Sequence, residues 1–285
     1  MKKIFCYLFF LSVAFFYISC QKNNENTSVH EIESRIRSKH DSRATFTFEE
    51  YERLLQELVK EKFDVIPLHK MFHYHNPAKV VVCMRHDVDV HIFKALQMAL
   101  LENKYDIQST YFMLATAPYY GEYKKGKITR YKCMEEYYKK ISGLGHEVGI
   151  HNDLLAIMIL EGMNPFLFNS GEISFYRSLG IPVVGTASHG SSIAMATVPN
   201  YEIFSDFAKS ENVNYKGKKY PLGIRPLQEF GFEYEAYFLD HTHYFSDLEG
   251  KWVKKYGFDY ITDILEKSEP GDRIQILTHP VWWGK

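Results

Sequence analysis

Residues 79–89, KVVVCMRHDVD, carry the clearest structural signal in this sequence. The run from Val80 to Met84 is short, apolar and largely β-branched, which is typical of a strand buried within a sheet. Arg85 to Asp89 follow directly and mix charged side chains with a histidine. The stretch therefore predicts a buried strand that ends in a cluster of polar groups.

Helical and extended patterns alternate on both sides of this strand. Apolar residues recur at helical spacing in segments 48–63, 95–104, 131–145 and 260–267, and short extended runs occupy segments 108–114, 146–151, 182–189, 235–243 and 273–279. Strands that alternate with helices favour an α/β domain with a mostly parallel sheet. In such folds, functional sites gather at the carboxyl ends of the strands.

Aspartate or histidine stands at the carboxyl end of several predicted strands. Asp87 and Asp89 close the strand described above, and His151, His189 and His279 close three others. Core packing gives no reason for apolar runs to end in such residues, and burying them without partners would be costly. If the strands are parallel, these side chains meet at one edge of the sheet and form a site.

The residue types in this cluster suit a divalent metal. Asp87 and Asp89 are two residues apart, so on a regular strand they point the same way and repel each other. A metal bound by one Asp and by neutral His side chains relieves that repulsion, and this ligand set is usual for zinc. The other Asp is then free to take a proton from water, and a histidine opposite it can protonate a leaving group. The structural alternative is a turn in which both carboxylates are solvated.

Four motifs, in order along the chain, resemble those of a known enzyme family. They are MRHDVD at 84–89, GHEVGIH at 145–151, SHG at 188–190 and LTHP at 277–280. Together they resemble the polysaccharide deacetylase superfamily, the group with NodB homology that is also called carbohydrate esterase family four. The resemblance covers residues 80–283 and implies a distorted (β/α)7-type barrel of about seven strands. It also implies metal-dependent removal of acyl groups from N- or O-acetylated sugars.

The resemblance assigns roles to individual residues. Asp87 matches the family's catalytic base, and Asp89 matches its metal-binding aspartate. His151 matches a metal-binding histidine, and His279 matches the histidine that acts as general acid. The cofactor implied is a divalent metal, with zinc preferred.

Two features of the chain depart from the family pattern. The family has a further metal-binding histidine four residues after the first, where this chain has Leu155. The family's arginine–proline motif, which orients the base, is not recognisable in residues 166–184. The motifs RHDVD, HExGxH, SHG and THPxWW therefore indicate a divergent branch. Within it, His189 is the best candidate for the missing ligand, because it also ends a predicted strand.

Other side chains near the strand ends are candidates for substrate contact. Trp282 and Trp283 directly follow His279, and aromatic rings beside a polar cleft suit stacking on sugar faces as well as ordinary core packing. Asp247 lies in SDLEGKW, a segment typical of the same branch, and is predicted to line the cleft or to lie in a plain turn. For His241 and His243 in the segment 235–243, a surface strand or a satisfied core is favoured over a site.

The N-terminal residues predict export. A basic start precedes the apolar run 4–18, and Cys20 follows it after a small residue. This is the order of a secretory signal peptide, and the run is short for a membrane span, which needs roughly 20 apolar residues. Residues 17–20 resemble the bacterial lipobox, so residues 1–19 are predicted to be a lipoprotein signal peptide and Cys20 its lipidated anchor. An ordinary cleaved signal or an uncleaved anchor is the alternative.

Composition divides the rest of the chain. Residues 20–44 are polar and charged, which predicts a flexible tether, and residues 45–285 are predicted to form the barrel domain. Lys and Arg number 34 against 35 Asp and Glu, so no basic field is available for binding nucleic acid. Cys83 and Cys133 are the two cysteines of the domain and could form one disulfide.

These observations favour a metal-dependent hydrolase of C–N or ester bonds that removes acyl groups, acetyl above all, from a glycan. A lipid anchor would place the protein at a membrane of the bacterial cell envelope, on its periplasmic or cell-surface face. Because Leu155 removes one ligand, the main alternative is a carbohydrate-binding lipoprotein with an impaired site. A metal-dependent hydrolase of another bond, such as a cyclic amide, is a third possibility.

Overall fold

The long strand β2 (Val80–Val88) lies at the centre of the fold. The computed structural model describes residues 27–124, 126–252 and 261–285, and β2 is buried along its whole length. It pairs in parallel with β3 (Thr110–Leu114) and β12 (Arg273–Thr278), and its first residues also pair with β1 (Phe63–Val65). The predicted buried strand is confirmed, and it continues beyond its apolar run into the charged residues.

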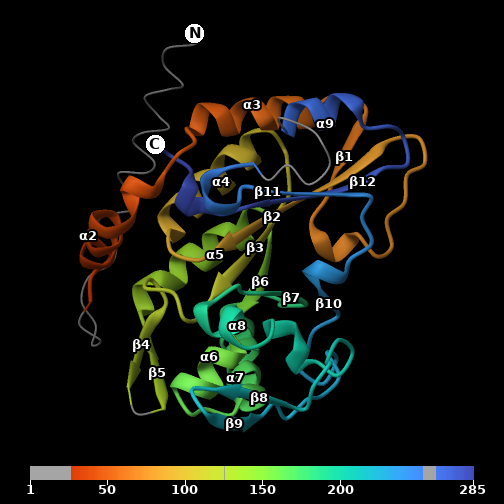
Figure 1. Ribbon diagram of the computed structural model, residues 1–285. Coiled ribbons are helices and arrows are strands. Elements are labelled where there is room, and N and C mark those ends of the chain that lie inside the picture. The colour runs from red at the N-terminus through yellow and green to blue at the C-terminus, as the bar shows by residue number, and fades with distance from the viewer. Residues whose placement is uncertain (1–26, 125, 253–260) are drawn as a thin grey trace.

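The main sheet is parallel and curls into a half-barrel (Figure 1). In the part of the chain that is described, its strands run in the order β10, β7, β6, β3, β2, β12, β11, with β1 beside β2. No pairing between described residues joins β10 to β11, so the sheet does not close into a full barrel. The predicted α/β class is confirmed, and the half-barrel is compatible with the distorted barrel expected. The strands not yet defined are β6 (Glu147–Asn152), β7 (Gly185–Ser188), β10 (Tyr234–Glu235) and β11 (His243–Ser246).

Helices lie between successive strands and bury apolar faces in the core. In α3 (Phe48–Leu58), for example, Tyr51, Leu54, Leu55 and Leu58 are buried at helical spacing. The other helices are α2 (Val29–His40), α4 (Ile92–Lys104), α5 (Glu135–Gly143), α6 (Leu154–Leu160), α7 (Pro165–Ser178), α8 (Ser192–Ala196) and α9 (Ile261–Lys267). Short 3-10 helices are η2 (Asp41–Arg43), η3 (Leu68–Lys70), η4 (Lys132–Met134), η5 (Asn200–Ile203), η6 (Ala236–Phe238), η7 (Leu248–Gly250) and η8 (Pro280–Trp282).

Several elements were not predicted from the sequence pattern. They include β1, the helices α6, α7 and α8, and two antiparallel hairpins outside the main sheet, β4 (Gly121–Lys124) with β5 (Lys127–Arg130) and β8 (Asn212–Tyr215) with β9 (Lys218–Pro221). The hairpin strands are mostly exposed or half-buried and lack the apolar runs that mark a core strand.

Polar partners on the helix side explain why β2 continues past its apolar run. His86 Nε2 lies 2.8 Å from Glu102 Oε1 on α4, and His86 Nδ1 lies 2.6 Å from Thr278 Oγ1 on β12. Glu102 also accepts hydrogen bonds from the hydroxyls of Tyr51 and Tyr111. Burial opposes ionisation of Glu102, but His86 and these donors lower its pKa to about 2. The histidine of RHDVD is therefore a structural residue, on the face of β2 away from the aspartates.

The expectation that residues 20–44 form a flexible tether is wrong for its second half. A capping box at Ser28 starts α2, and Ile32 and Ile36 on one face of that helix are buried in the core. The prediction failed because only a narrow apolar stripe marks this otherwise polar helix. The folded part therefore includes α2 and does not begin at residue 45.

The segment after α2 also packs on the domain. Asp41 Oδ1 lies 3.0 Å from His91 Nε2 and 3.3 Å from Lys94 Nζ at the start of α4. The Arg43 guanidinium carbon lies 4.5 Å from the centre of the Trp282 ring. The N-terminal segment thus supports the C-terminal turn of the chain.

The segment 235–243, predicted to be one strand, is divided in the structure. β10 ends at Glu235, where the carboxylate accepts a hydrogen bond from the Tyr237 N–H and starts η6. Extended pairing resumes only at His243, in β11. A side chain that bonds to its own backbone ended the strand, and apolar patterning does not reveal such an interaction.

Cys83 and Cys133 are both buried, and the disulfide between them that the sequence left open does not form among the described residues. Across these same ranges, no helix is both long and apolar enough to span a bilayer. The predicted signal peptide, residues 1–19, and the predicted lipidation site, Cys20, lie outside the described residues.

Candidate metal centre and acid–base groups

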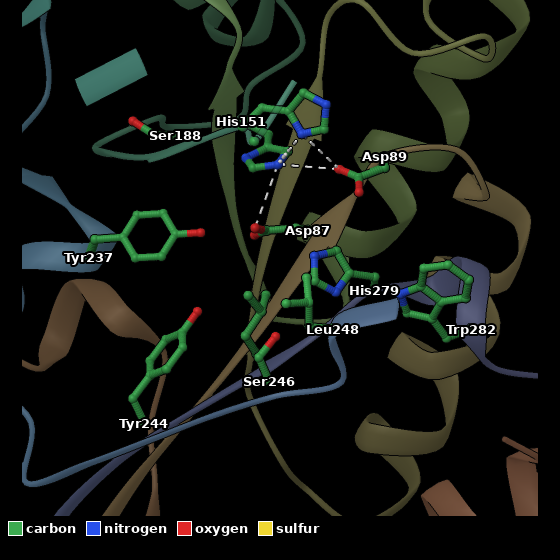
Figure 2. A pocket seen from close by; sticks show the side chains of 13 residues that line it. Asp87, Asp89, His151, Ser188, Tyr237, Tyr244, Ser246, Leu248, His279 and Trp282 are labelled. Atoms are coloured by element: carbon green, nitrogen blue, oxygen red, sulfur yellow. Dashed lines mark hydrogen bonds and ion pairs between the residues drawn. The ribbon is translucent and has the colours of Figure 1, made fainter. Parts of the chain in front are cut away.

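A pocket of about 320 Å³ opens at the carboxyl ends of the central strands (Figure 2). The five residues predicted from strand ends all line it, together with polar and apolar side chains from the neighbouring loops. The lining residues are Asp87, Asp89, His151, Ser188, His189, Gly190, Tyr237, Tyr244, Ser246, Leu248, Leu277, His279 and Trp282. The rule that parallel strands bring their carboxyl ends together therefore located the pocket correctly.

Three side chains in the pocket form a compact donor group. His151 Nε2 lies 3.2 Å from Asp89 Oδ1, His189 Nδ1 lies 3.4 Å from the same oxygen, and the two histidine nitrogens are 3.1 Å apart. Asp89 Oδ1 is buried without a hydrogen-bond partner among the described residues. Within these residues, Asp89, His151 and His189 make up the one group whose donor atoms converge in the manner of a metal site.

The spacing of these donors fits a small divalent ion. Ligands that lie about 2.0–2.1 Å from a tetrahedral zinc ion are about 3.3–3.4 Å from one another. The three observed separations, 3.1, 3.2 and 3.4 Å, are close to that value. One carboxylate with two imidazoles is also a donor set that such ions accept. The group could therefore hold a metal ion, as predicted.

Hydrogen bonding prepares His151 to act as a ligand. Its Nδ1 lies 2.8 Å from the Ala187 carbonyl oxygen, which can only accept, so Nδ1 carries a proton. In the neutral ring, Nε2 then presents a lone pair to the donor group. Burial lowers the pKa of His151, but the carboxylates of Asp87 and Asp89 outweigh burial and raise it. Without a metal, these carboxylates attract the proton on His151. A bound metal ion would take the place of that proton.

His189 is held in place by a buried polar bracket. The Asn200 side-chain amide donates to the His189 carbonyl at 2.8 Å and to Asp153 Oδ1 at 3.1 Å. Ser191 Oγ donates to the same Asp153 oxygen at 2.8 Å. Asn200 is fully buried, so its amide has no competing water. We refer to Asp153, Ser191 and Asn200 as the His189 bracket. Burial, reinforced by His151, lowers the pKa of His189 and favours a neutral ring.

Leu155, which stands where the resemblance to the deacetylase family led us to expect a histidine, is part of the apolar core. It is fully buried and does not line the pocket, and its N–H donates to Asn200 Oδ1 at 2.9 Å. It belongs to an apolar cluster with Ala156, Ile193, Val213 and Leu222. The same asparagine therefore links Leu155 to His189, the residue predicted to be a ligand.

Asp87 is held by Arg85, whose role was not predicted from the sequence. Arg85 Nε donates to Asp87 Oδ1 at 2.8 Å, and Nη2 donates to Oδ2 at 2.7 Å. Both side chains are almost completely buried. Burial raises the pKa of Asp87, but Arg85 and then His151 lower it, so the carboxylate is ionised. The signal was available, because residues two apart on a strand share a face.

Asp247 orients His279 and does not itself line the pocket. Its Oδ1 lies 2.6 Å from His279 Nδ1, and its Oδ2 accepts from the His279 backbone N–H at 2.9 Å and from Trp283 Nε1 at 2.8 Å. Burial lowers the pKa of His279, but Asp247 dominates and raises it to about 9. The prediction that Asp247 contacts substrate is therefore corrected to a positioning role through His279.

The two tryptophans differ in their surroundings. Trp282 lines the pocket, as predicted. Trp283 is buried and packs against Phe46 and Tyr51, with ring centres 4.7 and 5.1 Å away. The prediction that Trp283 contacts substrate is wrong, because its indole N–H is directed to Asp247 in the core. Tyr237 and Tyr244 also line the pocket, and no pattern in the sequence predicted that they would.

The remaining histidines of interest lie away from the pocket. His243 begins β11, at the strand end opposite the pocket, and its Nε2 is 3.7 Å from Asp272. His241 Nδ1 is 2.7 Å from the Leu239 carbonyl. Their predicted non-site role is consistent with these positions.

No protein-family model, curated protein or solved structure matches this chain.

Proposed function

We propose that the pocket is the active site of a metal-dependent hydrolase of the polysaccharide deacetylase (NodB) type. One observation carries the proposal. The donor group Asp89, His151 and His189 lies beside a carboxylate held by Arg85 and an imidazole held by Asp247. A ligand set, a separate base and a separate acid are the parts that hydrolysis of an acyl bond requires.

In this proposal Asp89, His151 and His189 would hold a divalent ion, zinc by preference, which would supply Lewis-acid activation of water and of the acyl carbonyl. Asp87 is ionised and takes a proton from the attacking water. His279 is protonated at neutral pH because its pKa is raised to about 9, and it donates that proton to the leaving nitrogen or oxygen. Arg85 and Asp247 keep these two side chains in position.

The proposed substrate is an acylated, above all acetylated, glycan of the bacterial cell envelope. Trp282 on the pocket wall supplies an aromatic face of the kind that packs on sugar rings. The proposed lipid on Cys20 would keep the enzyme at a membrane of the envelope.

The alternative of a carbohydrate-binding protein without catalysis was motivated by Leu155. The donor group counts against it, because His189 supplies a third donor without that position. Retention of both an acid and a base also favours an enzyme.

The test uses the protein purified in detergent, freed of metal and titrated with zinc. One ion per chain should bind tightly, and His189→Ala or His151→Ala should weaken that binding strongly. His241→Ala, at a histidine outside the pocket, is the matched control. Unchanged zinc affinity in His189→Ala would refute its assignment as a ligand.

The zinc-loaded protein is then offered a panel of acetylated glycans, and acetate release is measured. Asp87→Asn and His279→Gln should each lower the rate by about 10²-fold or more. Zinc binding without acetate release from any glycan would leave the binding-protein alternative in the lead.

A further inference from the structure

The pocket wall across from His279 carries two tyrosines. Tyr237 comes from η6 and Tyr244 from β11, and both line the pocket. In Figure 2 the Tyr237 hydroxyl points toward Asp87, and the Tyr244 hydroxyl points toward that of Tyr237. Neither tyrosine belongs to the ligand set or to the acid–base pair. The Tyr237 hydroxyl, which points toward the proposed base Asp87, therefore has no assigned role in the proposed reaction.

The backbone of Tyr237 is fixed to the strand that leads to His189. Glu235 Oε2 accepts from the Tyr237 N–H at 2.8 Å, and Glu235 Oε1 accepts from the Ser188 N–H at 2.8 Å. Glu235 is almost completely buried. One carboxylate therefore sets the position of Tyr237 relative to the residue next to a proposed metal ligand.

A buried cation lies against the Tyr237 ring. The Arg85 guanidinium carbon is 4.4 Å from the ring centre while the same guanidinium holds Asp87. A cation against the ring withdraws electron density from the phenol and strengthens its O–H as a donor. Tyr237 is 39% exposed as a whole residue, but desolvation of its hydroxyl on the pocket side raises its pKa and outweighs Arg85, so the hydroxyl keeps its proton at neutral pH.

Two other hydroxyls of the pocket, those of Ser188 and Tyr244, are less suited to this role. Ser188 Oγ accepts a hydrogen bond from the Asn152 amide at 3.4 Å, and in Figure 2 it points away from Asp87. Tyr244 interacts with Tyr237 and, in Figure 2, lies below it and farther from Asp87.

We propose that Tyr237 is a catalytic residue that donates a hydrogen bond to the acyl carbonyl oxygen as negative charge develops on it. The inference rests on the proposed hydrolysis and adds the group that stabilises the oxyanion. A preorganised donor of this kind is worth about 10²–10³ in rate in other acyl-transfer enzymes.

The chemistry balances with Tyr237 as a donor only. The water oxygen bonds to the acyl carbon, the carbonyl π electrons move to oxygen, and the water proton goes to Asp87. The C–N or C–O bond then breaks as the oxygen electrons return, and His279 protonates the leaving atom. Tyr237 keeps its proton throughout. Its hydrogen bond is strongest in the tetrahedral intermediate, where the former carbonyl oxygen carries a negative charge.

Acetate, whose oxygens resemble those of the charged intermediate, provides a test that needs no glycan. The protein in detergent is loaded with Co²⁺, and acetate is titrated while the visible cobalt absorption is recorded. Tyr237→Phe should weaken acetate binding about tenfold or more, since a hydrogen bond to a charged group is lost. Its Co²⁺ affinity should stay within about twofold of wild type. Tyr244→Phe is the matched control and should change acetate binding by less than about threefold.

The outcomes separate this inference from the proposed function. Equal acetate affinity in wild type and Tyr237→Phe overturns the role of Tyr237 and leaves the metal site standing. A wild-type protein that binds Co²⁺ but gives no acetate response also overturns it. Failure to bind Co²⁺ at all overturns the proposed function and this inference together.

Discussion

Arg85 and Asp87 alternate in β2, so Arg85 reaches Asp87 on one face, and Asp89 follows directly after the strand, where it lines the pocket together with Asp87. The end of this strand thereby supplies three charged groups. Arg85 positions Asp87, Asp87 is an ionised carboxylate, and Asp89 belongs to the donor group. His86, between them, faces the helix side and bonds Glu102. A shift of register by one residue would exchange the two sets, so β2 pairing and site chemistry depend on each other.

The buried pair of Arg85 and Asp87 should show strong coupling. Arg85→Met leaves the Asp87 carboxylate buried without its partner, so the protein should lose about 3–5 kcal/mol of unfolding free energy. Adding Asp87→Leu removes the unpaired charge and should recover much of that loss. Urea unfolding of the wild type, both single variants and the double variant measures the coupling. Additive losses would contradict it.

His279 should make the metal-free protein less stable at alkaline pH. Its folded pKa of about 9 exceeds its unfolded value, so its contribution is complete below about pH 6.5 and disappears as pH rises through 9. The upper limit of the contribution is about 3 kcal/mol. Between pH 6 and 9.5, urea unfolding should show a larger stability loss in wild type than in His279→Gln or Asp247→Asn. Parallel pH profiles would show that the ion pair with Asp247 does not form.

For individual residues, the sequence could identify pocket residues that stand at strand ends. It could not identify pocket residues that lie on turns between the elements. Asp87, Asp89, His151, His189 and His279 could be predicted to meet, because parallel pairing brings them to one edge. Tyr237 could not, since it enters from a 3-10 turn whose position depends on a distant carboxylate. The burial of Trp283 and Asp247 depends on core packing that local sequence does not encode.

Among the elements, the loop after β7 most directly decides whether the donor group is complete. His189 is its first residue, and the bracket of Asp153, Ser191 and Asn200 ties that loop to the start of α6. The bracket thereby fixes His189, a proposed metal ligand, beside the start of α6.

Asn200→Ala should therefore weaken zinc binding although Asn200 is not a ligand. Losing the bond to the His189 carbonyl should cost about 10–100-fold in affinity, as other supporting residues around metal sites do. Asn169→Ala is the control, because Asn169 is equally buried but bonds the distant Phe230 carbonyl. Zinc titration of both variants decides it. Equal losses would mean that only general stability changed.

Strongly apolar elements could be predicted from the sequence, and weakly patterned ones could not. The central strands and α3, α4, α5 and α9 carry clear periodicity and were found. The α2 helix was missed because two isoleucines four residues apart supply most of its buried face. The break at Glu235 was missed because a side-chain to backbone bond causes it.

For the whole molecule, α2 should count as part of the cooperative fold. Ile36→Ala should lower the unfolding free energy by about 2–5 kcal/mol, because the side chain is buried in the main core cluster. Lys39→Ala, on the exposed side of the same helix, should change it by less than about 0.5 kcal/mol. Urea unfolding compares them. A neutral Ile36→Ala would mean that α2 only rests on the surface.

The capped start of α2 also limits the length of the leash, the chain segment between Cys20 and the folded domain. Cys20 and Ser28 are eight chain steps apart, and an extended chain covers at most about 3.5 Å per step, so the leash is no longer than roughly 28 Å. With a lipid on Cys20, the domain would stay close to the membrane surface. It would reach only polymer strands in a thin layer directly above the bilayer, and strands lying farther out would be inaccessible to it.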